Sequence, residues 1–250
     1  MIAISGAASG LGEAVARHLL ALDAKGIVAL DKDKDRGAAL QGELGKRYLF
    51  VECDVADEHQ VQRSIDAGMA QFGAINAAIC AAAIGGPAKL LGRNGPMEMS
   101  KFDLVLKINL YGTMHMARSA ASAMLKNAPT ADGERGVLIN LSSGAAYEGQ
   151  IGQIAYAASK AAIVGMTLPL MRELSAHGIR VVTIAPGAFD TPMYAQVPPS
   201  VKDAIVAASM FPKRMGLPSE FAMFAEEIIR NPMHNGRTYR FDAGLSLPVG

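Results

Sequence analysis

Short apolar runs alternate with longer amphipathic segments along almost the whole chain. The runs are rich in β-branched residues and have no polar face, which is typical of strands buried on both sides. They lie at 2–5, 27–31, 48–53, 75–80, 136–142, 179–185 and 237–242. Segments with helical periodicity include 11–23, 57–72, 101–126, 154–176 and 219–230. This alternation predicts an α/β fold with a doubly wound parallel sheet of about seven strands and helices on both faces.

Two segments break the alternation, 84–100 and 187–218, and each follows a predicted strand. In sheets of this kind, ligands bind beyond the carboxyl ends of the strands. We therefore expect these segments to form the walls of a substrate pocket, although long loops can also be decorative.

The composition fits a single domain over residues 1–250. Half of the residues are hydrophobic (50%), enough to fill a large core, and no repeat, low-complexity tract or linker divides the chain. The net charge is +1 and no basic run is interleaved with aromatic residues. This argues against nucleic acid or an anionic membrane as a partner and favours a small molecule.

The two cysteines, Cys53 and Cys80, are too few for a disulfide framework and lack metal-ligand spacing. They fit a reducing compartment, so we expect no metal site and a cytoplasmic location. The first residues, "MIAISGAASG", look like a strand that enters a turn. We therefore expect no signal peptide, and also no membrane helix, because no apolar run approaches about 18 residues.

A glycine-rich turn follows the first predicted strand. In "SGAASGLGEAVARHLLAL", Gly6, Gly10 and Gly12 open an amphipathic helix, with Ser9 and Leu11 beside them. Glycine lets the backbone turn tightly and approach a pyrophosphate, while the helix N-terminus supplies free N–H groups. Glycine turns are common, but this place between a strand and a helix is what dinucleotide binding requires. The turn therefore predicts a Rossmann-type cofactor site.

Asp31 closes the second predicted strand, nineteen residues after Gly12. A carboxylate there accepts hydrogen bonds from the ribose hydroxyls of adenosine and repels a 2′-phosphate, which favours NAD over NADP. An ordinary turn aspartate is the alternative. Lys32, Lys34 and Arg36 could offset the repulsion, and we interpret them as a solvated loop.

Asp54 and Val55 follow the third predicted strand in the sequence "CDV". The carboxylate can accept a hydrogen bond from the adenine amino group while Val55 packs on the ring. A simple turn is an equally good interpretation of Asp54.

The sequence "YAASK" places Tyr156 and Lys160 four residues apart in a predicted helix. Residues at this spacing lie on the same helix face. Most such pairs are a core tyrosine beside a solvated lysine, so the pair gains meaning only from the rest of the chain.

Taken together, these motifs resemble the short-chain dehydrogenase/reductase family over essentially the whole chain. The resemblance rests on the glycine turn, Asp31, Asp54, "INLYG", "NLSSG", "YAASK" and "APGAFDTP" in this order. It implies a cofactor-binding part at about 1–142 and a catalytic and substrate-loop part at about 143–250. It also adds residues to the NAD site, namely Ala82, Pro186, Gly187, Phe189 and Thr191.

The resemblance assigns the catalytic set to Ser143, Tyr156, Lys160 and Asn109. Ser143, thirteen residues before Tyr156, would stabilise charge on the reacting oxygen. An ammonium nearby, together with an oxidised nicotinamide, would lower the pKa of Tyr156 so that the phenolate exchanges a proton with the substrate. Lys160 would also hold the nicotinamide ribose, and Asn109 would hold a water that links Lys160 to solvent.

Two positions depart from the family pattern. The usual threonine before the glycine turn is Ser5, which keeps the hydroxyl, and the usual Asn-Asn-Ala-Gly after the fourth strand is "CAAA" at 80–83. The lost amides put some sheet-to-helix hydrogen bonds in doubt and alter the wall beside the cofactor ribose.

A non-catalytic NAD-sensing protein on the same fold is the alternative from another functional class. Such a protein would have little need of the serine, tyrosine and lysine together.

The helices at 101–126 and 154–176 carry more apolar residues than a one-sided surface helix needs. These residues include Leu110, Met114, Met116, Ile163, Met166 and Leu170. With the resemblance, this predicts a homotetramer in which these helices pack across a two-fold axis. The C-terminal strand and the tail 245–250 would form a second contact.

The finer sequence pattern is similar to the type-2 3-hydroxyacyl-CoA dehydrogenases. This resemblance implies a 3-hydroxyacyl-CoA substrate, and Lys89 and Arg93 could meet its phosphates, although surface solvation is the more common role. A steroid, a terpenoid or a small aromatic alcohol remains an alternative, because nothing in the sequence demands a thioester. We expect Gln150 and Gln153 to lie at the edge of the substrate pocket, and Met193, Met210 and Phe211 to form its flexible apolar lid.

Overall fold

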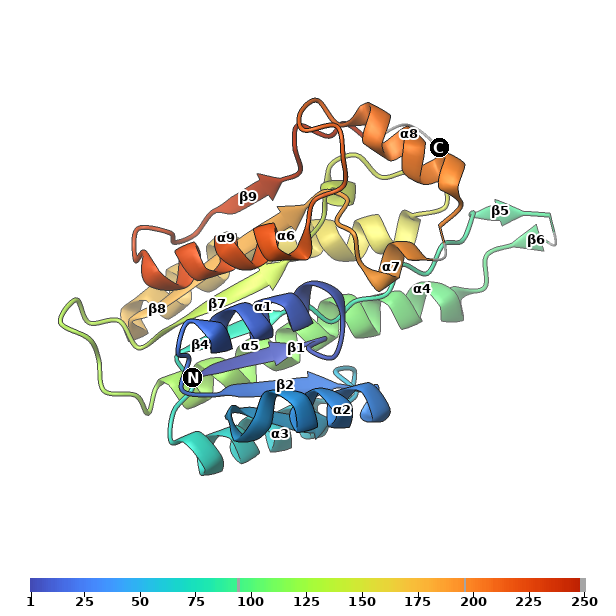
Figure 1. Cartoon of the computed structure of the whole chain (residues 1–250). Coiled ribbons are helices and arrows are strands. Elements are labelled where there is room, and N and C mark those ends of the chain that lie inside the picture. The colour runs from blue at the N-terminus through green and yellow to red at the C-terminus, as the bar shows by residue number, and fades with distance from the viewer. Residues whose placement is uncertain (94, 196, 248–250) are drawn as a thin grey trace.

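The computed structural model describes residues 1–93, 95–195 and 197–247. Seven parallel strands form one sheet in the order β3-β2-β1-β4-β7-β8-β9 (Figure 1). The strands are β1 (Ile2–Ser5), β2 (Ile27–Asp31), β3 (Tyr48–Glu52), β4 (Ala77–Cys80), β7 (Gly136–Leu141), β8 (Ile179–Pro186) and β9 (Thr238–Phe241). The predicted fold class is confirmed, with each predicted strand within two residues of its observed bounds.

The strand order reverses at β1, which pairs with β2 on one side and with β4 on the other. The strands β1, β4, β7 and β8 are buried along their whole length. This explains why their sequences are apolar without alternation, since helices cover both faces of the sheet.

Helices pack on both faces of the sheet. The core beneath α1 (Gly10–Ala21), α2 (Lys34–Leu44) and α9 (Pro218–Arg230) is one cluster of buried side chains. A second cluster lies beneath α3 (Glu58–Phe72), α5 (Gly112–Met124) and α6 (Ile154–Leu174). Ligands of such a sheet bind at the point where the strand order reverses, beyond the carboxyl ends of β1 and β4.

The sequence pattern did not predict α2. Only Gly37 and Leu40 of this helix are buried, so its apolar periodicity is weak. Its start is fixed instead by Asp33, whose side chain accepts a hydrogen bond from the Arg36 backbone N–H at 3.0 Å. Capping of this kind stabilises a helix whose sequence has little amphipathic character.

The predicted helix over 101–126 is interrupted. α4 (Met99–Leu106) continues into a π-helical turn at Lys107–Tyr111 and then into α5. Such turns occur often at functional sites. This one carries Asn109, which is fully buried.

The two irregular segments contain short elements of their own. β5 (Leu91–Gly92) and β6 (Gly95–Pro96) form a hairpin that extends away from the body of the protein (Figure 1). α7 (Pro192–Ala195) and α8 (Pro199–Ala208) occupy the second segment.

The expectation that no apolar segment approaches the length of a membrane-spanning helix does not hold for α6. Ile154–His177 spans 24 residues with a mean hydropathy of 1.4, enough by length and composition to cross a membrane. Core helices of globular proteins can meet the same criterion. α6 packs on β8, and its lysine Lys160 donates to a carbonyl of β7.

Candidate active site

A cavity of about 390 Å³ opens where the strand order of the sheet reverses. The glycine turn, the ends of β2 and β3, the start of α6 and the segment after β8 surround it. The predicted cofactor, catalytic and substrate residues that line it are Gly6, Ser9, Gly10, Leu11, Gly12, Asp31, Asp54, Val55, Ala82, Ser143, Tyr156, Lys160, Pro186, Gly187, Phe189, Thr191 and Met193. The structure therefore brings residues from all parts of the chain to one cavity.

The glycine turn leaves no room for a side chain at Gly6 or Gly12. Gly6 has a φ of +68°, and a Cβ there would lie 2.8 Å from the Ala82 backbone nitrogen. A Cβ on Gly12 would collide with the Gly6 carbonyl oxygen. Ser9 precedes α1 without capping it through its side chain, so the first N–H groups of the helix remain available for an anion.

Asp31 lies at the end of β2, on the rim of the cavity. Its carboxylate accepts hydrogen bonds from the Ala8 and Asp33 backbone N–H groups, each at 3.0 Å. Asp54 accepts in the same way from the Ala56 backbone N–H at 2.9 Å. These bonds fix the two carboxylates while both face the cavity.

Val55 forms part of the wall between Asp54 and α5. A Cβ added to Gly112 would lie 2.7 Å from a Val55 methyl group, so α5 presses directly on this side chain. The valine is thereby held as an apolar surface next to the cavity.

Ser143 and Ser142 have different tasks, as the family spacing implied. The Ser143 Oγ accepts a hydrogen bond from the Ala145 N–H at 3.1 Å, which leaves its own proton free to donate. It also bonds with the Tyr156 hydroxyl. The Ser142 Oγ instead donates to the Lys160 carbonyl at 2.8 Å and so ties α6 to β7.

Lys160 is almost completely buried, with 3% of its surface exposed. Its Nζ donates to the Leu141 carbonyl at 2.8 Å and lies 5.7 Å from the centre of the Tyr156 ring. Burial lowers the pKa of Lys160 to about 8. The ammonium therefore sits in a site where its charge is poorly solvated.

The protein groups alone do not lower the pKa of Tyr156. Burial raises the pKa of its hydroxyl, and the hydrogen bond with Ser143 opposes this rise only in part. Protein groups alone therefore keep the phenol protonated at neutral pH, and Lys160 does not reverse this. The expected lowering needs a further positive charge in the cavity.

Asn109 does not face the cavity. Its amide accepts from the Ile84 N–H at 2.9 Å and donates to the Ile84 carbonyl at 3.0 Å and to the Ser159 Oγ at 3.1 Å. Ile84 does line the cavity. In this arrangement the Asn109 side chain positions the wall and α6, and its assignment as the holder of a water stays a prediction.

The wall after β8 is held by backbone contacts. Thr191 donates to the Phe189 carbonyl at 3.3 Å and lies opposite Gly10 of the glycine turn. The Gly187 N–H donates to the Phe241 carbonyl at 3.0 Å. The segment therefore forms the wall of the cavity next to Gly10.

Ser5 contacts the altered motif at 80–83. The Ser5 carbonyl accepts from the Ala81 N–H at 3.2 Å, and its Oγ accepts from the Ala82 N–H at 3.4 Å. The hydroxyl that stands where the family has threonine thus holds the wall next to the two positions that lack amide side chains.

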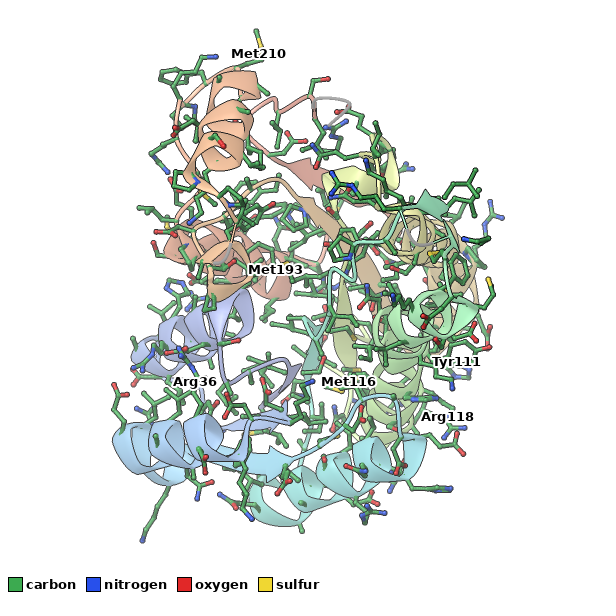
Figure 2. The ribbon with its side chains drawn as sticks, turned by 90° about the vertical axis from the view of Figure 1, so that its right-hand side faces the viewer. Arg36, Tyr111, Met116, Arg118, Met193 and Met210 are labelled. Atoms are coloured by element: carbon green, nitrogen blue, oxygen red, sulfur yellow. The ribbon has the colours of Figure 1, made fainter. Side chains whose placement is uncertain are left out.

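Most of the residues predicted for the substrate pocket alone do not line the cavity. Met193 lines the cavity, whereas Met210 and Phe211 do not and are 71% and 83% exposed. Figure 2 shows Met210 far from Met193, at the outer end of the molecule. The assignment of Met210 and Phe211 to a lid over the substrate stays a prediction.

Gln150 and Gln153 lie at the start of α6, where the Gln153 amide donates to the Gln150 side-chain oxygen at 3.2 Å. Neither lines the cavity. The backbone around Gln153 pairs with Ala88, so this turn anchors the segment that carries the β5–β6 hairpin.

The sequence interpretation missed Tyr194, which lines the cavity beside Met193. Burial, together with the neighbouring Tyr156, raises the pKa of Tyr194 to about 12. The only sequence signal was its place in the segment 187–218, which was expected to form the pocket wall.

A sequence model described as short chain dehydrogenase matches residues 1–202. The chain is 41% identical over 246 residues to the 3-hydroxyacyl-CoA dehydrogenase type-2 of Drosophila melanogaster, a match that covers 98% of this chain and 96% of that protein. The human protein of the same name is 40% identical over 246 residues, covering 98% and 94%.

A crystal structure of 3-hydroxyacyl-CoA dehydrogenase type-2 from Mycobacterium avium superposes with a TM-score of 0.93 at 39% identity. The match covers 100% of this chain and 96% of that one. Since the family model spans most of the chain and these relatives match almost all of it, the chain belongs to the short-chain dehydrogenase family, whose members are oxidoreductases.

Proposed function

We propose that this protein is an NAD-dependent dehydrogenase that interconverts a 3-hydroxyacyl-CoA and its 3-oxoacyl-CoA. The observation that carries the proposal is the meeting of Ser143, Tyr156 and Lys160 in one cavity with the glycine turn. A protein that only senses the cofactor has no use for a serine that is free to donate a proton next to a buried tyrosine.

The cavity suits a dinucleotide. The turn at Gly6 and Gly12 is a cradle that a Cβ would fill, and the N–H groups at the start of α1 suit a pyrophosphate. Asp31 and Asp54 would hold the adenosine end. When bound, an oxidised nicotinamide supplies a positive charge and accepts the hydride.

Ser143 and Tyr156 handle the proton. With its Oγ already accepting from the Ala145 N–H, Ser143 donates to the reacting oxygen and stabilises the charge that develops there. Tyr156 takes the hydroxyl proton of the alcohol during oxidation and returns it during reduction. The raised pKa of Tyr156 suits its role as the acid in the reduction.

Lys160 keeps two protons beyond the one given to the Leu141 carbonyl. In our proposal these face the cavity and hold the ribose next to the reacting carbon. The hydrogen bond from Ser142 to the Lys160 backbone fixes this part of α6.

The proposed substrate follows from the relatives that share about 40% identity over nearly the whole chain. The apolar lining near Met193 and Tyr194 suits a short acyl chain. Lys89 and Arg93 stay candidates for the CoA phosphates. A free steroid, terpenoid or aromatic alcohol would use the same catalytic residues.

A substrate panel tests this assignment. We expect 3-hydroxybutyryl-CoA or its 2-methyl homologue to reduce NAD with a kcat/KM at least about tenfold above that of steroid or terpene alcohols. NADH formation at a fixed concentration of each alcohol is the measurement. Good turnover of a free alcohol with none of the CoA esters would overturn the substrate and leave the dehydrogenase chemistry in place.

The choice of NAD is a second prediction. Since Asp31 faces the cavity, a 2′-phosphate would meet a carboxylate, and we expect kcat/KM to be about tenfold or more higher with NAD than with NADP, equivalent to about 1.4 kcal/mol. The Asp31→Asn variant should lower the ratio of kcat/KM with NAD to kcat/KM with NADP. Asp57→Asn, which changes the exposed residue that caps α3, should leave this ratio unchanged. Equal efficiencies in the unaltered protein would contradict the proposal.

The oligomer is a third proposal. Of the residues expected at the two-fold axis, Met116 and Ile163 are fully buried in the core, which corrects that part of the interpretation. Leu104, Tyr111 and Leu168 instead expose 52%, 56% and 39% of their surface on α4, the π-helical turn and α6. Figure 2 shows Tyr111 at the edge of the molecule.

We therefore propose that α4, α5 and α6 pack against a second copy, within a tetramer in which β9 and the tail form the other contact. Residues 248–250 of that tail lie outside the described residues. Light scattering at micromolar concentration should give four times the chain mass, and Tyr111→Glu should halve it or reduce it further. A monomer mass for the unaltered protein would contradict the proposal.

The cytoplasmic location stays a prediction, consistent with two free buried cysteines.

A further inference from the structure

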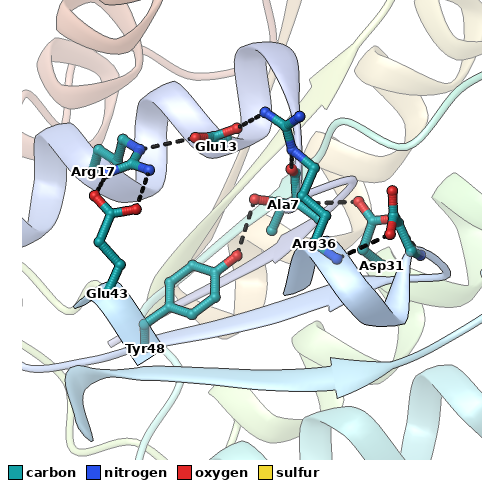
Figure 3. A network of polar contacts seen from close by, with 9 residues as sticks. Ala7, Glu13, Arg17, Asp31, Arg36, Glu43 and Tyr48 are labelled. Carbon is teal, nitrogen blue, oxygen red and sulfur yellow. Dashed lines mark hydrogen bonds and ion pairs between the residues drawn. The ribbon is translucent and has the colours of Figure 1, made fainter. Parts of the chain in front are cut away.

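Two charged side chains hold the same residue of the glycine turn. Asp31 accepts from the Ala8 N–H at 3.0 Å, and the Arg36 Nε donates to the Ala8 carbonyl. The Arg36 guanidinium and the Asp31 carboxylate therefore both bind the backbone of Ala8. Asp31 is the carboxylate that we propose for the adenosine end of the cavity. Figure 3 shows Asp31 and Arg36 beside the glycine turn.

Glu13 on α1 holds the far side of the Arg36 guanidinium. The Arg36 Nη2 lies 2.7 Å from the Glu13 Oε2. The other oxygen of Glu13 accepts from the Arg17 Nε at 2.9 Å (Figure 3). Only 16% of the Glu13 side chain is exposed, whereas 47% of the Arg36 side chain is. The carboxylate is thus the more buried partner, and Arg36 is the more exposed one.

The network continues away from the cavity. Arg17 also binds Glu43 on α2 with two hydrogen bonds, at 2.6 and 2.8 Å. Glu43 touches Arg17 but not Arg36 in the described network, and 57% of its side chain is exposed. It is therefore a control carboxylate in the same network, which is more exposed than Glu13 and has no contact with Arg36.

Neither Glu13 nor Arg36 is among the described residues that line the cavity, although Asp31, Lys32 and Asp33 are. A guanidinium is the group that recognises phosphate best, through paired N–H donors. Arg36 is close enough to the rim to serve a 2′-phosphate, and its pairing with Glu13 engages one arm of the guanidinium and neutralises its charge.

We propose that Glu13 sets the cofactor selectivity of the cavity by holding Arg36 away from the site of a 2′-phosphate. This inference rests on the proposed use of NAD and adds a second element to it. Asp31 repels the 2′-phosphate, and Glu13 pairs with Arg36, the cation that would attract it. The Nε contact with Ala8 keeps Arg36 beside the turn when Glu13 is changed, so the released Nη groups stay within reach.

Binding of adenosine phosphates by the purified protein tests this without catalysis. The probes are 2′,5′-ADP, which carries the 2′-phosphate, and 5′-AMP, which lacks it, each titrated by calorimetry at low salt. Glu13→Gln should bind 2′,5′-ADP about fivefold more tightly than the unaltered protein, since a partly exposed ion pair is worth about 1 kcal/mol. Binding of 5′-AMP should change by less than about twofold, and the gain should shrink in high salt.

Two further variants identify the cation. Glu43→Gln removes the same charge from the same network and should leave the ratio of the two affinities unchanged. Glu13→Gln combined with Arg36→Met should lose the gain. If Glu13→Gln behaves like Glu43→Gln, or if the gain survives the loss of Arg36, the proposal is wrong.

The unaltered protein separates this proposal from the one on which it rests. If it binds 2′,5′-ADP more tightly than 5′-AMP, the preference for NAD itself fails. If it prefers 5′-AMP and Glu13→Gln still shows no gain, only the role of Glu13 fails.

Discussion

Replacing Tyr156 with phenylalanine is expected to lower kcat by about a thousandfold or more, because the substrate hydroxyl loses the group with which it exchanges its proton. The ring itself stays, so the packing of α6 and the shape of the cavity should not change. Binding of NADH should therefore remain within about twofold of the unaltered protein. Steady-state rates and the fluorescence of bound NADH measure the two effects separately.

Tyr194→Phe is the matched control for this variant. Tyr194 is also a half-buried tyrosine that lines the cavity, and burial also raises its pKa, to about 12. In our mechanism it exchanges no proton with the substrate, so its loss should cost less than about tenfold in kcat. Comparable losses of kcat for Tyr156→Phe and Tyr194→Phe would contradict a specific role of Tyr156 in proton transfer.

Replacing Lys160 with methionine is expected to lower kcat/KM by at least about a hundredfold, because the ribose and the reacting carbon lose the group that positions them. Its effect on stability should depend on pH. The pKa of Lys160 is about 8 in the folded protein, against 10.5 for an ordinary lysine. Below about pH 8 the buried ammonium destabilises the fold by about 3 kcal/mol, and this penalty is lost as the pH rises from about 8 to about 10.5.

The sign follows from proton binding. Between these two pH values the unfolded chain holds the proton of Lys160 and the folded chain does not, so stability rises with pH. The unfolding free energy of Lys160→Met, minus that of the unaltered protein, should therefore fall by about 3 kcal/mol between about pH 7 and pH 11. Denaturant unfolding at both pH values measures it. Lys126→Met, at an exposed position of the chain, should show no such change, and a flat difference for Lys160→Met would refute the buried charge.

Much of the site could be predicted because its residues follow strands. Gly6, Asp31, Asp54 and Pro186 come at the carboxyl ends of β1, β2, β3 and β8, and a parallel sheet brings these ends to one edge. The order of the motifs then named the family. The substrate side could not be predicted in the same way, because it depends on the path of the segment 187–218 rather than on strand ends.

Three features could not be predicted from the sequence, each for a physical reason: α2, the π-helical turn and the direction of the pKa shift of Tyr156. α2 has too few buried residues to show a periodicity. The π-helical turn that places Asn109 leaves the apolar pattern of its helix nearly unchanged, so a sequence pattern cannot reveal it. The pKa of Tyr156 depends on how deeply α6 buries the hydroxyl, and the spacing of Tyr156 and Lys160 says nothing about this depth.

The most direct test of the central claim follows the hydrogen itself. The protein is incubated with NAD and 3-hydroxybutyryl-CoA that carries deuterium on carbon 3, and the products are analysed by mass spectrometry. The account predicts 3-oxobutyryl-CoA without the label and NADH that carries one deuterium on the nicotinamide ring, with the hydroxyl proton released to solvent. Failure of the deuterium to appear in NADH, with the ester recovered unchanged or altered elsewhere, would contradict hydride transfer from carbon 3 to NAD.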